Sequence, residues 1–157
     1  SHDPVESGIE IISLASVCKL QKSMALNIKC DGMSSFLEPF RREIESTGSF
    51  FFDASIPEMF TYRKMGWPHA LRISEFEKNL AWKCNGVWLD SFTDDWFIQD
   101  RNIAQLLENH FLILVSPELH GRDPRFAWDW FFTLRKIFGD RLRICTDLPK
   151  RLLTHDQ

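Results

Sequence analysis

The sequence has little of several features that mark common functional classes. Its 19 lysines and arginines are fewer than its 22 aspartates and glutamates, which gives a net charge of -3. A surface that follows nucleic-acid phosphates normally needs a basic excess, so we expect no binding of DNA or RNA. No apolar run approaches the roughly 18 residues of a membrane-spanning helix. We therefore expect no transmembrane segment.

The four cysteines are widely scattered and form no CxxC pair. Cysteines that build disulfide frameworks or zinc sites usually recur at short, regular spacings. We therefore interpret them as reduced packing residues of a cytoplasmic protein. The N-terminus also lacks the charged and then apolar layout of a signal peptide, so an export signal would have to lie before Ser1.

The sequence does contain a regular alternation of short apolar runs and stretches with helical spacing. This alternation is typical of βα units and a parallel sheet. Six apolar runs end in polar residues and are strand candidates, namely MALNIKCDG ending near Lys29, SFFFDAS near Asp53, HALRISE near Ser74, GVWLDSF near Asp90, FLILVSPELHG near Glu118 and LRICTDLP near Asp147.

Capping residues stand where the helices are expected to begin. Ser35 to Glu38, Ser55 to Glu58 and Ser74 to Glu77 each fit the pattern S-x-x-E, in which the two side chains satisfy free N–H groups at a helix start. We predict helices over residues 35–46, 56–65, 75–83, 94–109 and 124–138, and a short helix after Pro149.

These units predict an α/β fold of the TIM-barrel type with about six βα units. A complete eight-unit barrel typically needs about 250 residues, and the chain has 157. We therefore expect residues 1–157 to form a single C-terminal portion of a barrel whose first two strands are missing. An open doubly wound sheet would fit the length, but the sequence lacks the Gly-rich phosphate loop that normally follows its first strand.

An incomplete barrel leaves unpaired strand edges, which are prone to aggregate unless another chain covers them. We therefore expect an oligomer or a partner chain at the open edge.

The carboxyl ends of the strands of a parallel barrel converge on one mouth. Carboxylates, imidazoles and two cations together suit a divalent cation and a phosphate ester. The residues gathered in this way are Lys29, Asp31, Asp53, Arg72, Asp90, Glu118, His120 and Asp147, joined by His2 and Asp3 if SHD is also a strand end.

A structural role stays open for each of these residues. Lys29 could pair with Asp53 or Asp31, and Arg72 could pair with Asp53 or Asp90. The carboxylates could instead accept hydrogen bonds from loop N–H groups.

Four motifs in series resemble a known family. SHDP, LNIKCDG, FFFDAS and TDLP are similar, in this order, to strand-end motifs of the glycerophosphodiester phosphodiesterases and the related phosphatidylinositol-specific phospholipases C. The resemblance implies a metal-dependent hydrolase that acts on glycerophosphodiesters or related phospholipid headgroup esters. It also implies a divalent cation, which would be Mg²⁺, Ca²⁺ or Mn²⁺.

The resemblance assigns roles to particular residues. His2 matches a His-Asp strand end and would act as a general acid or base. Lys29 matches the lysine of a Glu-x-Lys strand end, so it would contact the phosphate and stabilise charge during the reaction. Asn27 stands where that motif has its metal-binding glutamate. An amide oxygen can ligate such a cation, but without charge the site should be weaker.

The remaining site residues are expected from their positions at strand ends. Asp53 and Asp90 are candidate metal ligands, and Arg72, Glu118 and His120 are candidate substrate contacts. The family's first catalytic histidine and its Glu-x-Asp metal pair would lie before Ser1, so we expect the chain alone to be inactive. The alternative is a non-catalytic barrel remnant that binds a phosphorylated ligand or a partner chain.

Overall fold

The computed structural model describes residues 12–77, 83–100 and 102–155. All six predicted strands are confirmed within these residues, although the first two are short. They are β1 (Ala25–Leu26), β2 (Phe50–Phe51), β3 (Ala70–Ile73), β4 (Gly86–Leu89), β5 (Phe111–Val115) and β6 (Leu142–Cys145).

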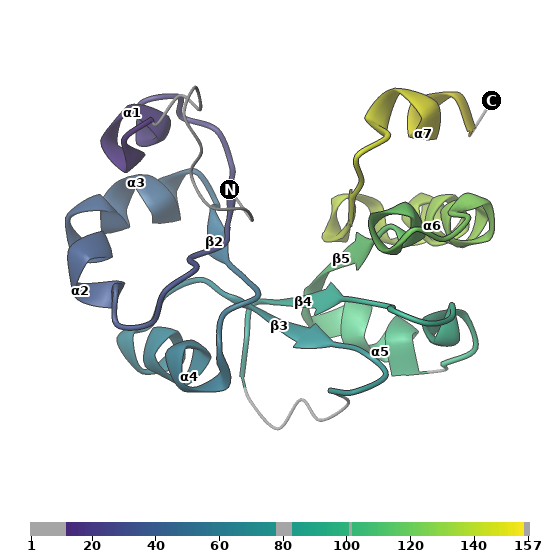
Figure 1. Ribbon diagram of the computed structural model, residues 1–157, viewed down its shortest axis with the longest axis horizontal. Coiled ribbons are helices and arrows are strands. Elements are labelled where there is room, and N and C mark those ends of the chain that lie inside the picture. Colours follow the sequence, from purple (N-terminus) through teal and green to yellow (C-terminus); the bar gives the residue numbers. More distant parts are fainter. Residues whose placement is uncertain (1–11, 78–82, 101, 156–157) are drawn as a thin grey trace.

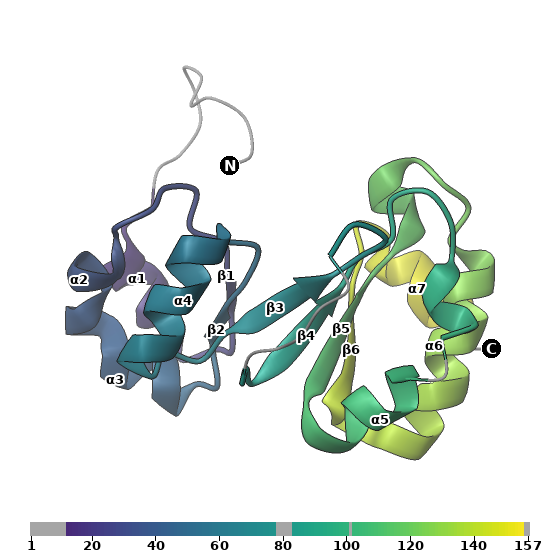
Figure 2. The ribbon, with the colours of Figure 1, turned by 90° about the horizontal axis from the view of Figure 1, so that it is seen from below.

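Every strand pair is parallel, and the strands lie side by side in the order of the chain (Figure 2). β1 pairs with β2, and β3 to β6 form a four-stranded sheet. A single parallel bridge between Phe51 and His69 connects the two sheets. The α/β class with parallel strands is therefore confirmed. A doubly wound sheet would instead reverse its strand order at a switch point, and the described strands do not.

The helices surround the strands from outside (Figure 1). α1 to α4 cover the N-terminal strands and α5 to α7 cover the C-terminal ones. Their bounds are α1 (Leu14–Cys18), α2 (Ser34–Leu37), α3 (Arg41–Ser46), α4 (Ile56–Met65), α5 (Asn102–Asn109), α6 (Arg125–Phe138) and α7 (Pro149–His155), with 3-10 turns η1 (Glu38–Phe40), η2 (Trp96–Ile98), η3 (Pro117–His120) and η4 (Gly139–Arg141).

The predicted helices over 56–65 and 124–138 and the helix after Pro149 are confirmed as α4, α6 and α7. The predicted helix over 35–46 is broken into α2, η1 and α3, because Pro39 has no N–H group to continue the hydrogen bonding of α2. The helix predicted over 94–109 divides into η2 and α5. α1 is an additional helix without a sequence prediction.

Two of the three predicted capping boxes are wrong. Ser35 lies inside α2, whose start has no side-chain cap. Residues 75–77 are not helical, and Glu77 binds Arg72. Residues 78–82 of that predicted helix lie outside the described residues. Of these three serines, Ser55 caps a helix, since its hydroxyl accepts a hydrogen bond from the N–H of Glu58 at 3.4 Å.

The strands alternate their side chains between two faces, and both faces are apolar. The outer face packs against the helices through residues such as Val87, Leu89, Leu112 and Leu114. The inner face carries a separate cluster made of Phe50, Ala70, Trp88, Ile113 and Val115. Both faces of the sheet are therefore buried, as expected for parallel strands.

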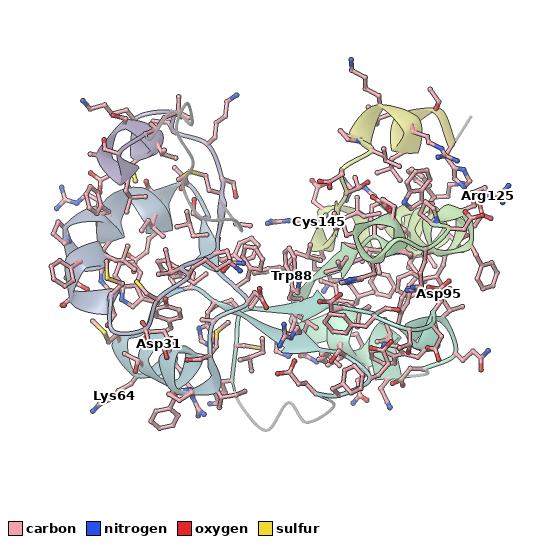
Figure 3. All side chains as sticks on the ribbon, in the orientation of Figure 1. Asp31, Lys64, Trp88, Asp95, Arg125 and Cys145 are labelled. Atoms are coloured by element: carbon pink, nitrogen blue, oxygen red, sulfur yellow. The ribbon has the colours of Figure 1, made fainter. Side chains whose placement is uncertain are left out.

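A hollow of ≈ 520 Å³ lies on the inner face between the two edge strands. Residues at β1 line one side and residues of β6 line the other, while Phe50, Trp88 and Ile113 also contribute. Figure 3 shows Trp88 and Cys145 near the middle of the molecule, where the two halves face each other. The sheet therefore curves enough to bring its two edges to a common cavity.

Among the helices of the described ranges, none combines the length and apolar character needed to cross a membrane.

Candidate functional site

Asp53 is the centre of a polar cluster at the carboxyl ends of the first three strands. Arg72 donates a hydrogen bond from Nη1 to Asp53 Oδ1 at 2.7 Å. Lys29 Nζ lies 3.4 Å from Asp53 Oδ2, and Asn27 Nδ2 donates to the same oxygen at 3.1 Å. The structure thus brings together four of the predicted site residues, which come from three consecutive strand ends.

The backbone turns sharply at Asp53, two residues after the last residue of β2. The φ angle of Asp53 is 52°, in the left-handed region that residues other than glycine seldom adopt. Aspartate tolerates this conformation better than most residues because its short side chain can bond locally. Backbone strain of this kind often accompanies functional positions. The strained residue, Asp53, is also the one that pairs with both Lys29 and Arg72.

Arg72 is held by two carboxylates, while Lys29 is more open. The Arg72 Nε group pairs with Glu77, and this contact, together with Asp53, raises the pKa of the guanidinium. The side chain of Arg72 is 35% exposed, whereas that of Lys29 is 46% exposed. The Lys29 ammonium is therefore the group of this cluster that can most easily reach a ligand.

A second polar pair lies at the ends of β4 and β5. His120 Nε2 is 2.7 Å from Asp90 Oδ1, and the N–H of Ser91 donates to the same oxygen at 2.9 Å. Asp90 is 8% exposed and His120 is 22% exposed. The ring of Phe92 packs against the imidazole, with 4.6 Å between the ring centroids. These contacts fix the position of the imidazole at the edge of the sheet.

Glu118 is enclosed by hydroxyl groups from neighbouring strand ends. Its carboxylate accepts hydrogen bonds from Ser116 and Thr146. Ser116 in turn accepts a hydrogen bond from Trp128 Nε1 at 2.8 Å. This network connects β5, β6 and α6. Glu118 thus holds the ends of β5 and β6 in position relative to each other, whichever ligand the neighbouring groups bind.

Cys145 lies next to this network but has the character of a packing residue. Burial, with smaller contributions from the charges of Asp147, Glu118 and Asp90, raises the pKa of its thiol. The thiol is the weak nucleophile and the thiolate the strong one. Cys145 therefore has no features of an activated nucleophile.

Sequence reasoning missed several partners in these networks. Glu77 is predicted as a cap but serves as a carboxylate partner of Arg72. Ser116 and Thr146 are not among the predicted site residues, although both directly follow a strand, β5 and β6 respectively. That position at a strand end is the signal that could have identified them.

The described residues offer individual metal donors rather than a complete coordination shell. Within residues 12–77, 83–100 and 102–155, no group of three or more His, Cys, Asp or Glu side chains is placed to hold a metal ion. The Oδ1 atom of Asn27 is buried and accepts no hydrogen bond from the described residues, so it is available to a cation. Asp53 is occupied by Lys29 and Arg72.

His2 and Asp3, which the sequence analysis assigns to a strand end, lie outside the described residues. Their predicted roles therefore stay predictions.

Comparisons with protein-family models, with curated proteins and with solved structures found no match. The resemblance to the glycerophosphodiester phosphodiesterases therefore depends on the sequence motifs alone.

Proposed function

We propose that this chain is part of a parallel barrel that binds and hydrolyses a phosphodiester at the carboxyl ends of its strands. The observation that carries the proposal is the convergence of Lys29 and Arg72 on Asp53. Cationic side chains held in place at the carboxyl ends of parallel strands are suited to bind a phosphate group. The substrate class is a glycerophosphodiester or a related phospholipid headgroup ester, as the motif series implies.

The sheet supports the barrel part of this proposal in two ways. Its strands follow the chain order, and helices cover its outer face. Residues of its first and last strands, β1 and β6, line the same hollow, and Arg135, Asp140 and Arg143 are part of this lining. We propose that further parallel strands, from a partner chain or from a longer form of this one, close the barrel at this hollow.

The phosphate would lie beside Lys29, whose ammonium is the most exposed cation of the cluster. Arg72 would add a second positive charge from the neighbouring strand, with its guanidinium orientation fixed by Asp53 and Glu77. Groups held in place before the ligand arrives lose little entropy on binding and can stabilise charge that develops in the transition state.

A divalent cation, Mg²⁺, Ca²⁺ or Mn²⁺, belongs to the proposal because of the motif resemblance. From this chain, Asn27 and Asp53 are the residues that would help to hold it. When bound, such a cation neutralises charge on phosphoryl oxygens. Asp90 is a further expected ligand, but His120 already binds one of its oxygens. Other ligands would therefore have to come from groups beyond the described residues.

One observation favours binding without turnover as a second candidate. Asp53 and Asp90, the charged ligands expected for the metal, already face Lys29, Arg72 and His120. Asn27, the third expected ligand, carries no charge. A site without a tightly held cation would bind a phosphorylated ligand but leave its ester bond intact.

The two candidates are separated by a hydrolysis assay on the protein in the length in which its source makes it. Glycerophosphocholine is incubated with Mg²⁺, Ca²⁺ or Mn²⁺ in turn, and with a chelator as the control. Hydrolysis that the chelator abolishes supports the hydrolase. Binding of the same compound without hydrolysis supports the second candidate, and absence of both contradicts the proposal.

A further inference from the structure

The Asp53 cluster has the form of an anion-binding site that already holds an anion, the carboxylate of Asp53 itself. Arg72 Nη1 donates a hydrogen bond to Oδ1 of this carboxylate at 2.7 Å. Lys29 Nζ and Asn27 Nδ2 lie 3.4 Å and 3.1 Å from its Oδ2. Cationic and amide donors arranged around two anionic oxygens are also the groups that bind phosphate. The carboxylate of Asp53 therefore lies where a phosphate would make the same contacts.

The contacts of Asp53 are accessible to a ligand that arrives from the solvent. The exposed fraction of the side chain is 26% for Asp53, 35% for Arg72 and 46% for Lys29. Ion pairs that are this exposed stabilise a fold only weakly, so a competing anion can replace them. Arg72 would keep its orientation after such a replacement, because its Nε group also donates to Glu77.

We propose that a ligand binds by displacing the Asp53 carboxylate from between Lys29 and Arg72. This inference rests on the proposed function. The bound carboxylate lowers the affinity of the site for every anion, because its own contacts have to break first. A ligand compensates for this loss best when it offers one anionic oxygen to each cation, as the two non-bridging oxygens of a phosphodiester do. Asp53 thereby limits the site to ligands that can contact both cations at once.

The test uses Asp53→Asn, which removes the charge and keeps the shape of the side chain. Asparagine also tolerates the left-handed backbone of this position, where φ is 52°. The matched control is Asp31→Asn, which removes the same charge near the end of β1. Among the described residues, the Asp31 carboxylate accepts hydrogen bonds from the Ser55 hydroxyl and makes no ion pair with Lys29 or Arg72.

Binding of glycerophosphocholine is measured by NMR titration of the protein in its natural length, with a chelator present so that no divalent cation contributes. Asp53→Asn should bind about tenfold more tightly than the wild type, or more, since no carboxylate has to leave two charged donors. Asp31→Asn should stay within about twofold of the wild type, because solvent and salt screen an exposed charge. Adding Lys29→Met to Asp53→Asn should remove most of the gain.

The wild type offers a second measurement that does not depend on the folding of a variant. Saturation with glycerophosphocholine should shift the side-chain carboxyl ¹³C resonance of Asp53, because this carboxylate loses its contacts with Lys29 and Arg72. The corresponding resonance of Asp31 should stay in place.

The outcomes distinguish this inference from the proposed function. A folded Asp53→Asn variant that binds no more tightly than the wild type overturns the displacement and leaves the proposed function in place. An unchanged Asp53 resonance in a wild type that binds the ligand does the same. An equal gain in Asp31→Asn also overturns the displacement, because net charge alone would then explain the effect. Absence of binding in both the wild type and Asp53→Asn overturns both proposals.

Discussion

The two halves of the molecule repeat the same βα unit but stabilise it differently. In the N-terminal half, β1 and β2 have two residues each, and three packed aromatic rings lie among the aliphatic residues of the core. Phe51 stacks on Tyr62 with 4.7 Å between centroids and meets Trp67 edge-on at 5.3 Å. In the C-terminal half, four strands form a continuous ladder over a core that is mainly aliphatic and also includes Phe97 and Phe131. The N-terminal half therefore has far less backbone pairing between strands, and we expect it to depend more on side-chain packing for its stability.

The two parts of the candidate site differ in how they relate to these halves. The Asp53 cluster connects the halves, because Asn27 and Lys29 come from the N-terminal half and Arg72 comes from β3. The Asp90–His120 pair belongs to the C-terminal half alone. A change in the alignment of the two halves would therefore alter the Asp53 cluster more than the Asp90–His120 pair.

The largest expected effect is the loss of an aromatic ring from the N-terminal core. Phe51→Ala should lower the free energy of unfolding by about 3–5 kcal/mol, because Phe51 is fully buried between two rings. Phe36→Ala, at an exposed position of α2, should change it by less than about 0.5 kcal/mol. Urea unfolding followed by far-ultraviolet circular dichroism measures both.

The same experiment tests whether the halves unfold together. Leu114→Ala in β5 should cost about 2–5 kcal/mol, and both core variants should keep a single transition. Two separate transitions in Phe51→Ala would contradict cooperative unfolding of the two halves.

A smaller effect is expected at Gly86 of β4, where the backbone lies against the ring of Phe111 in β5. A methyl group at Gly86 would overlap the ring of Phe111 on the neighbouring strand. Gly86→Ala should therefore lower the free energy of unfolding by about 1–3 kcal/mol. Adding Phe111→Leu should recover part of the loss. A Gly86→Ala variant as stable as the wild type would contradict this packing of the C-terminal ladder.

The smallest effect concerns a carboxylate in the loop after β3. Burial favours a higher pKa for Glu75, but hydrogen bonds from the N–H groups of Thr93 and Phe92, from its own N–H and from the Thr93 hydroxyl lower the pKa from 4.5 to about 2. The charged form is thus favoured by folding. Its stabilisation is present above the ordinary pKa and is lost as the pH falls through the folded value.

Urea unfolding at about pH 6 and about pH 3 measures this contribution. The wild type should lose more stability between the two pH values than Glu75→Gln, whose side chain does not titrate. An equal loss in both proteins would show that the loop does not hold the carboxylate of Glu75 in the folded state.

The sequence predicted the strands better than the helices and the partners of the site. A short apolar run such as FLILV, followed by polar and turn residues, is typical of a strand buried on both faces, so β5 could be predicted from hydrophobicity together with length. The capping pattern at Ser74 was misleading because Glu77 has a stronger partner in Arg72, which only the folded chain brings near. The strand-end positions placed Asp90 and His120 at the same edge of the sheet, but they are 30 positions apart and no local pattern could show that they pair with each other.

The most direct test of the central claim is an NMR titration of the chain with glycerophosphocholine. We expect saturable shifts at the backbone amides of Lys29, Asp53 and Arg72. Lys29→Met should weaken binding by about tenfold or more, since a hydrogen bond to a charged group is lost. Lys64→Met, at an exposed lysine near the end of α4 that Figure 3 labels, should bind like the wild type. Equal affinity in both variants, or no shifts at these strand ends, would contradict a phosphate site at Lys29.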